Sequence, residues 1–274
     1  MNHENSEYYY ARIDGHRIAY MDQGEGPVVI LLHGIPTSGL LWRNIVPTLA
    51  QSHRVIVPDM LNYGRSDKPL DSNVSIAAQS DVLLRLMDAL GIRSADLVAH
   101  DIGGGVAQIL ATRHPERINR LVLADAVCFD SWPIPEFEPL QKPEAENDMS
   151  PEELEKMLRD FLPQGMHNTD NATEALADMI VAPWQGETGK AAFFRNIRRL
   201  NPEYTLAIAD DLANIQHKTL VLWGKHDSFQ KPGYAEKLSG TLPNARIEWV
   251  ESAHWITEEQ PAEVARILSE FLAQ

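Results

Sequence analysis

The chain has 274 residues, of which 44% are hydrophobic and 23% are charged, and its formal net charge is −15. This composition is typical of a folded globular protein with one large domain, or one domain with an insertion, and it argues against disorder. Because Lys and Arg are few and spread along an acidic chain, the composition argues against a surface that binds nucleic acid.

The first half of the chain alternates between strand and helix patterns. Two extended segments, residues 7–14 and 16–24, meet at Asp14-Gly15, a strong hairpin signal. An uninterrupted apolar run at residues 28–34 predicts a strand buried on both faces. Further predicted strands cover residues 54–59, 95–101 and 118–127, and predicted helices cover 38–50, 75–91 and 104–115. This alternation is typical of a parallel sheet covered by helices.

Residues 129–217 break the alternation. They begin with a Pro-rich irregular stretch and continue with acidic and amphipathic helical patterns, without a strand pattern. Alternation then resumes, with predicted strands at 218–224 and 245–251 and predicted helices at 231–242 and 262–273. We therefore expect a core domain of residues 1–128 and 218–274, interrupted by a helical cap, residues 129–217, hereafter the cap segment.

Three polar residues stand where predicted strands end, namely Asp101, Asp227 and His254. The carboxyl ends of parallel strands border one crevice, so we expect these side chains to meet. Asp101 also lies in Ala99-His100-Asp101-Ile102-Gly103, where small residues flank a central one. A sharp strand-to-helix turn needs such small flanks, and it exposes the central side chain as a nucleophile.

These segments together resemble the α/β-hydrolase family over essentially the whole chain. Residues 31–38 resemble its HGxP loop, residues 55–69 the next strand and loop, residues 223–227 its acid-bearing turn, and residues 252–255 its histidine loop. The resemblance implies an α/β-hydrolase fold, with a mostly parallel twisted sheet flanked by helices and an inserted helical cap. Most members carry Ser at the elbow, whereas an Asp there is similar to the haloalkane dehalogenase and epoxide hydrolase branch.

This resemblance implies a hydrolase that acts on a small organohalide or epoxide. Asp101 would attack a saturated carbon and form an alkyl ester, and water activated by His254 would then hydrolyse that ester. Asp227 would orient His254 as the acid of the triad. Asp125 is an alternative acid, because it stands at the position where some haloalkane dehalogenases have their catalytic acid.

The groups that assist the leaving group in this branch are absent. Backbone N–H groups of Ile35 and Ile102 are expected to form the oxyanion hole. Haloalkane dehalogenases, however, usually carry an Asn and a Trp at these two positions, and fluoroacetate dehalogenases carry an Arg at the second. The segment resembling the cap Tyr-Tyr-Arg of epoxide hydrolases reads Phe193-Phe194-Arg195.

Four cap residues are candidate pocket residues that could replace these donors. Trp184 is the preferred halide donor and Tyr204 the preferred epoxide acid, and Trp132 and His167 are further candidates.

Two other functions stay open. An ester or lactone hydrolase could use the same residues, but acyl transfer to Asp would give an anhydride, which ranks this hypothesis lower. Alternatively, the chain could be a ligand-binding relative that has kept the fold but does not catalyse a reaction, because a fold alone does not determine function.

No cofactor and no metal site are predicted, and the single Cys128 excludes an internal disulfide and a Cys-based metal site. The start of the chain, residues 1–17, lacks the pattern of a secretory signal. No run reaches the ~18 apolar residues that span a bilayer. We therefore expect a cytoplasmic monomer or homodimer. Its expected partner is a small-molecule substrate, and we expect it to bind neither nucleic acid nor a membrane.

Overall fold

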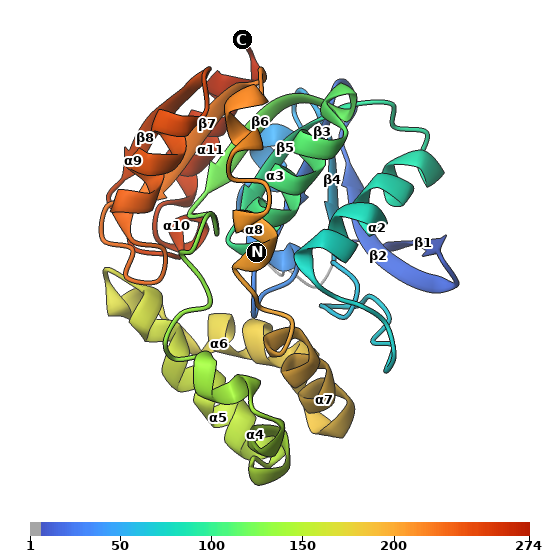
Figure 1. Ribbon diagram of the computed structural model, residues 1–274, viewed down its shortest axis with the longest axis vertical. Helices are drawn as coiled ribbons and strands as arrows, with labels where there is room; N and C mark the ends of the chain where they lie inside the picture. Colours follow the sequence, from blue (N-terminus) through green and yellow to red (C-terminus); the bar gives the residue numbers. More distant parts are fainter. Residues whose placement is uncertain (1–6) are drawn as a thin grey trace.

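The computed structural model describes residues 7–274, and in this range one eight-stranded sheet forms the centre of the molecule (Figure 1). The strand order is β1-β2-β4-β3-β5-β6-β7-β8; β1 and β2 pair antiparallel, as do β2 and β4, and all other pairs are parallel. The strands are β1 Tyr9–Ile13, β2 His16–Gln23, β3 Val28–Leu32, β4 Arg54–Pro58, β5 Ala95–His100, β6 Ile118–Ala124, β7 Lys218–Gly224 and β8 Ala245–Val250. This topology confirms the predicted fold class.

The most apolar strands lie in the middle of the sheet. All six residues of β5 are buried, between β3 on one side and β6 on the other. A strand covered by helices on both faces has no solvent side, which explains the continuous apolar run of β3 and the buried Leu97-Val98-Ala99 of β5. Asp101 directly follows this central strand.

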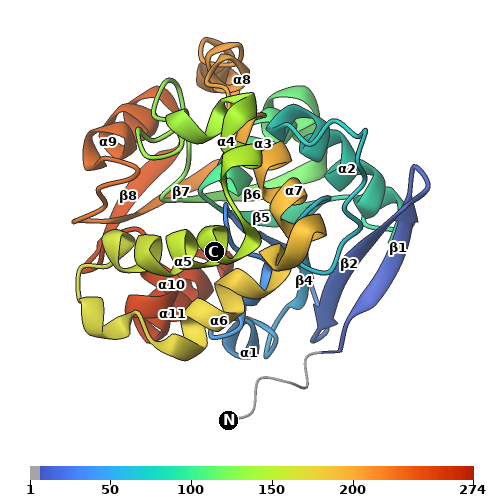
Figure 2. The same cartoon turned by 90° about the horizontal axis from the view of Figure 1, so that it is seen from below.

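Helices cover both faces of the sheet. In Figure 2, α2, α3 and α9 lie along one face and α1, α10 and α11 along the other. The helices of the core are α1 Val46–Leu49, α2 Ile76–Ala89, α3 Ile102–Arg113, α9 Pro232–Thr241, α10 Ile256–Glu259 and α11 Pro261–Leu272. None of the helices in residues 7–274 is both long enough and apolar enough to cross a bilayer.

The cap segment runs between β6 and β7. Its α-helices are α4 Pro143–Asp148, α5 Pro151–Phe161, α6 Glu174–Val181, α7 Gly186–Ile197 and α8 Glu203–Leu206. Figure 1 shows α4 to α7 grouped together at one end of the sheet, where the parallel strands have their carboxyl ends. The helix α5 begins with a full capping box, in which Ser150 and Glu153 bond each other's backbone.

Two local predictions have different outcomes. The hairpin forms at Asp14-Gly15, where both residues have positive φ. The continuous helix predicted at residues 38–50 is wrong, because the segment forms a 3₁₀ turn at Gly39–Trp42 and the short α1. Pro47 has no N–H and therefore fits the first turn of a helix but not its interior. The prediction of no secretory signal rests partly on residues 1–6, which lie outside the described residues.

The tight packing of α3 gives a stability prediction. A Cβ on Gly103 would lie 2.5 Å from the backbone oxygen of His33, whereas a Cβ on Gly240, also in a helix, meets nothing within 4 Å. We expect Gly103→Ala to lower the free energy of unfolding by about 1–3 kcal/mol through overpacking. Gly240→Ala is the matched control and is expected to change it by less than about 1 kcal/mol, in the stabilising direction. Urea unfolding measures both, and equal effects would contradict this account.

Candidate active site

Asp101 stands in a strained turn between β5 and α3. Its φ is 51° and its ψ is −122°, a conformation that non-glycine residues rarely adopt. The N–H of Asp101 donates to Ala124 O (3.2 Å), and its carbonyl accepts from Val127 N (3.1 Å). These bonds tie the turn to the end of β6 and hold the side chain at the carboxyl edge of the sheet.

The two carboxylate oxygens of Asp101 have different surroundings. Oδ1 accepts a hydrogen bond from the backbone N–H of Ile35 (2.9 Å), in the loop that follows β3. Oδ2 lies 4.0 Å from Nε2 of His254, which is too long for a direct hydrogen bond. The side chain is only 8% exposed. One oxygen is thus fixed by the backbone, while the other faces a cavity and an imidazole.

Asp227 and His254 form a direct pair. Nδ1 of His254 lies 2.9 Å from Oδ2 of Asp227, and the other oxygen of Asp227 accepts from the N–H groups of Phe229 and Gln230. The fold therefore brings Asp101, His254 and Asp227 together, as the sequence predicts.

Asp125 lies nearby but does not contact the imidazole. Its backbone φ is 41°, and its Oδ1 accepts from the N–H of Gly224 at the end of β7 (2.8 Å). Among the described residues, Oδ2 of Asp125 has no hydrogen-bond partner. Burial and the negative charge of Asp227 raise the pKa of Asp125 well above its usual range. This residue thus supports the turn that leads to Asp227 and favours the neutral form.

Burial and mutual charge set the protonation of the pair that faces the cavity. Burial raises the pKa of Asp101, although His254 and the backbone N–H groups of Ile102 and Ile35 oppose this shift. For His254, burial alone would lower the pKa, but the charge and hydrogen bond of Asp227 and the charge of Asp101 together raise it above its ordinary value. The imidazole therefore depends on its two carboxylate neighbours for its proton affinity.

A narrow cavity lies between the sheet and the cap segment. Its free volume is about 20 Å³, roughly the room of one water molecule. Its core side is lined by Ile35, Asp101, Ile102, Val127, Phe229, Gln230, His254 and Trp255, and its cap side by Trp132, Pro133, Ile134, Phe137, Phe161 and Leu200. The cap side of this cavity is apolar, so a substrate bound beside Asp101 would contact an apolar wall.

Gln230 is a polar cavity residue that the sequence analysis missed. It is 1% exposed, and its Oε1 has no hydrogen-bond partner in the part of the chain that the structure describes. A buried amide without a partner is costly, so its place in a cavity wall points to a ligand or a water. Its only sequence signal is its position three residues after Asp227.

The predicted cap residues have different locations. Trp132 lines the cavity, but its indole N–H donates to the Thr205 hydroxyl (2.8 Å). The structure does not bring Trp184, Tyr204 or His167 to the cavity. The indole N–H of Trp184 donates to Pro36 O (2.7 Å), Tyr204 is half-buried on α8, and His167 is exposed.

Backbone bonds join the cap segment to the His254 loop. The N–H of His254 donates to Gly165 O in the cap (3.0 Å), and the indole of Trp255 donates to Leu162 O (3.1 Å). The Glu259 carboxylate accepts from the N–H of Ala253 in this loop and from the N–H of His167 in the cap. The position of the imidazole is therefore coupled to the cap.

Comparisons with known proteins agree with this architecture. The family model described as alpha/beta hydrolase fold matches residues 27–261. The chain is 31% identical to 2-hydroxymuconate semialdehyde hydrolase of Pseudomonas putida, over 95% of this chain and 92% of that protein. It is 28% identical to cis-3-alkyl-4-alkyloxetan-2-one decarboxylase of Shewanella oneidensis, over 95% of this chain and 86% of that protein. The crystal structure of haloalkane dehalogenase DbeA from Bradyrhizobium elkani superposes with a TM-score of 0.86, at 25% identity and 97% coverage of both chains.

The charges around His254 give a pH prediction. Asp227→Asn removes the carboxylate that offsets burial, so we expect the pKa of His254 to fall and the imidazole to stay neutral to lower pH. Asp125→Asn replaces a carboxyl that favours its neutral form and should leave this pKa close to that of the wild type. An NMR titration of the His254 ring in both variants measures the effect. An equal shift in both would contradict the assignment of Asp227 as its partner.

Proposed function

We propose that this chain, which belongs to the α/β-hydrolase fold family, hydrolyses small apolar organohalides through an ester formed on Asp101. The main support for this proposal is that the two carboxylate oxygens of Asp101 have different surroundings. Oδ1 accepts a hydrogen bond from the Ile35 N–H, and Oδ2 lies beside His254. A serine hydrolase would require a hydroxyl at this elbow, where the chain has a carboxylate. A carboxylate suits attack on a saturated carbon, because the product is a stable alkyl ester.

In the first step, Oδ2 of Asp101 attacks the carbon that bears the halogen. The new C–O bond forms as the carbon–halogen bond breaks, and the halide leaves with the electron pair. The nucleophile is well positioned because the N–H of Ile35 fixes its other oxygen and the elbow fixes its backbone.

In the second step, His254 takes a proton from a water that attacks Cγ of the ester. The negative charge develops on the oxygen held by Ile35, where backbone N–H groups stabilise it. The intermediate collapses and releases the alcohol, which receives the proton from His254. The carboxyl of Asp101 keeps the other proton of the water and loses it to solvent, which restores the carboxylate. Esterification has removed the charge of Asp101, one of the causes that raise the pKa of His254, so the imidazole is a more available base in the intermediate.

The polar groups of the cavity favour a leaving group that needs no proton. The indole N–H groups of Trp132 and Trp255 both donate to protein oxygens, and the Gln230 amide is the remaining neutral donor in the described wall. The NH2 group of this amide can donate a hydrogen bond to a departing halide, whereas its unpartnered Oε1 can only accept one. Opening an epoxide produces an alkoxide that requires an acid, and the lining residues include no further acid beside the Asp101 and His254 pair.

A strained lactone is a second candidate substrate. The similar protein of Shewanella oneidensis is named for action on an oxetan-2-one, a four-membered lactone. Attack of Asp101 on the alkyl carbon of such a ring would also form an alkyl ester. The leaving group would be a carboxylate, which likewise needs no proton.

Trapping the ester tests the proposal. His254→Gln removes the base but keeps the nucleophile, so we expect the alkyl group to accumulate on the peptide containing Asp101. Intact mass spectrometry separates the substrate classes. A haloalkane adds its alkyl group without the halogen, whereas an epoxide or a lactone adds its whole mass.

Asp101→Asn is the control for the trapping experiment. It should form no adduct and should lower kcat/KM by at least about a thousandfold. The covalent mechanism is wrong if wild type turns over a panel member and the His254→Gln variant never gains its mass. Adducts only with epoxides would replace the organohalide by an epoxide, and adducts only with lactones would favour the second candidate.

Gln230 gives a further prediction for the same substrates. Gln230→Leu keeps the shape of the wall but removes the amide, so we expect kcat/KM for haloalkanes to fall about tenfold, the worth of one buried hydrogen bond. The loss should be larger for chlorides than for iodides, because chloride is the poorer leaving group and needs more assistance. Steady-state halide release measures both, and an equal loss for all halides would indicate a packing role.

A further inference from the structure

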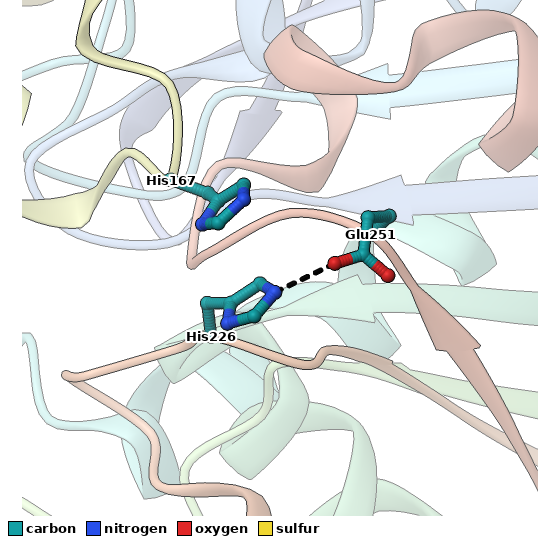
Figure 3. Close-up of side chains that lie close together, drawn as sticks. All are labelled: His167, His226 and Glu251. Atoms are coloured by element: carbon teal, nitrogen blue, oxygen red, sulfur yellow. Dashed lines mark hydrogen bonds and ion pairs between the residues drawn. The ribbon is translucent and has the colours of Figure 1, made fainter.

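Three potential metal ligands meet on the surface at the junction of cap and core. His167 belongs to the cap segment, His226 to the loop after β7, and Glu251 follows directly after β8. Figure 3 shows the two imidazole rings one above the other, with the carboxylate of Glu251 beside them. All three residues are exposed, and they lie outside the cavity described above.

The geometry of this cluster is compact. The ring centroids of His167 and His226 are 3.9 Å apart and the rings are inclined by 10°. Nε2 of His226 lies 2.7 Å from Oε1 of Glu251. One ligand atom from each of the three residues lies within 4.8 Å of those from the other two. The three ligand atoms are therefore close enough for one ion, although the stacked rings must rotate before their nitrogens converge on it.

We propose that His167, His226 and Glu251 bind a divalent transition metal, with Zn²⁺ as the best match. Two imidazole nitrogens and one carboxylate oxygen are typical zinc ligands, and water can complete a tetrahedral site. Ca²⁺ and Mg²⁺ fit less well, because they prefer oxygen ligands. The net charge of −15 adds a general attraction for cations.

One neighbouring charge competes with the metal. Nζ of Lys225 lies 2.7 Å from Oε2 of Glu251, and this lysine is half exposed. The lysine contacts Oε2, whereas Oε1 shares a hydrogen bond with Nε2 of His226, which a metal bound by both atoms would replace.

The bound ion would fasten the cap to the loops that present the proposed acid and base. His226 directly precedes Asp227, and Glu251 lies just before the loop of His254. The backbone N–H of His167 already bonds Glu259, which holds Ala253 in that loop. Zinc would therefore add a second link at a junction that otherwise depends on hydrogen bonds, and would restrict movement of the cap there.

Calorimetric titration of the tag-free full-length chain with Zn²⁺ tests the proposal. We expect one saturable site, and we expect His167→Gln and Glu251→Gln each to weaken binding at least about tenfold. His114→Gln is the matched control, because His114 is partly exposed beside a carboxylate, that of Glu116, but has no third ligand among the described residues. The affinity of the His114→Gln variant for Zn²⁺ should equal that of the wild type.

Two further measurements test the link itself. Zinc should raise the Tm of the wild type and not that of His167→Gln, because binding stabilises only the form that contains the site. Zinc should also slow amide exchange in residues 166–172 of the wild type. Absence of saturable binding overturns the proposal, and unchanged binding in His167→Gln overturns the link between cap and core. Since the altered side chains are exposed, circular dichroism should report unchanged folding.

Discussion

The positive φ of Asp101 is the constraint on which the site depends. Such a conformation costs about 1–3 kcal/mol in a non-glycine residue, so its surroundings must hold it. Bonds to Ala124 and Val127 hold the backbone, and the glycine at 103 allows α3 to start against the β3 loop. The same twist directs the carboxylate toward the Ile35 N–H. Contacts from β6, from α3 and from the loop after β3 thus all hold Asp101 in this conformation.

Buried charge is the second constraint. Asp101, His254 and Asp227 are all nearly inaccessible, and burial penalises the charged form of each. The carboxylates accept backbone hydrogen bonds, and the imidazole lies between them, so each charge is compensated by the others. Removing one member leaves the remaining charges poorly compensated. The apolar cap wall strengthens these interactions by excluding water.

Most of the fold and the central site could be predicted from the sequence, because both follow from local rules. The central parallel strands are largely buried and rich in apolar residues, and the carboxyl ends of the parallel strands bring Asp101, Asp227 and His254 to one edge. Other features depend on contacts between distant segments. The choice between Asp125 and Asp227 rests on backbone turns that direct one carboxylate to Gly224 and the other to the imidazole. Likewise, the indole of Trp184 donates to the Pro36 carbonyl, which is distant in the sequence. Gln230 lines a cavity whose other wall belongs to the cap segment.

The bond from the His254 N–H to Gly165 O also bears on how such proteins can be rebuilt. A cap inserted between two neighbouring strands of the sheet resembles an exchangeable module. Here, however, the cap supplies an acceptor for the backbone of the imidazole loop, and through Trp184 it also supports the loop of Ile35. A chimera that receives a foreign cap would keep Asp101, Asp227 and His254 and still lose the supports that orient two of the loops around them. Exchange of substrate range by cap grafting would therefore require both contacts to be transplanted with the helices.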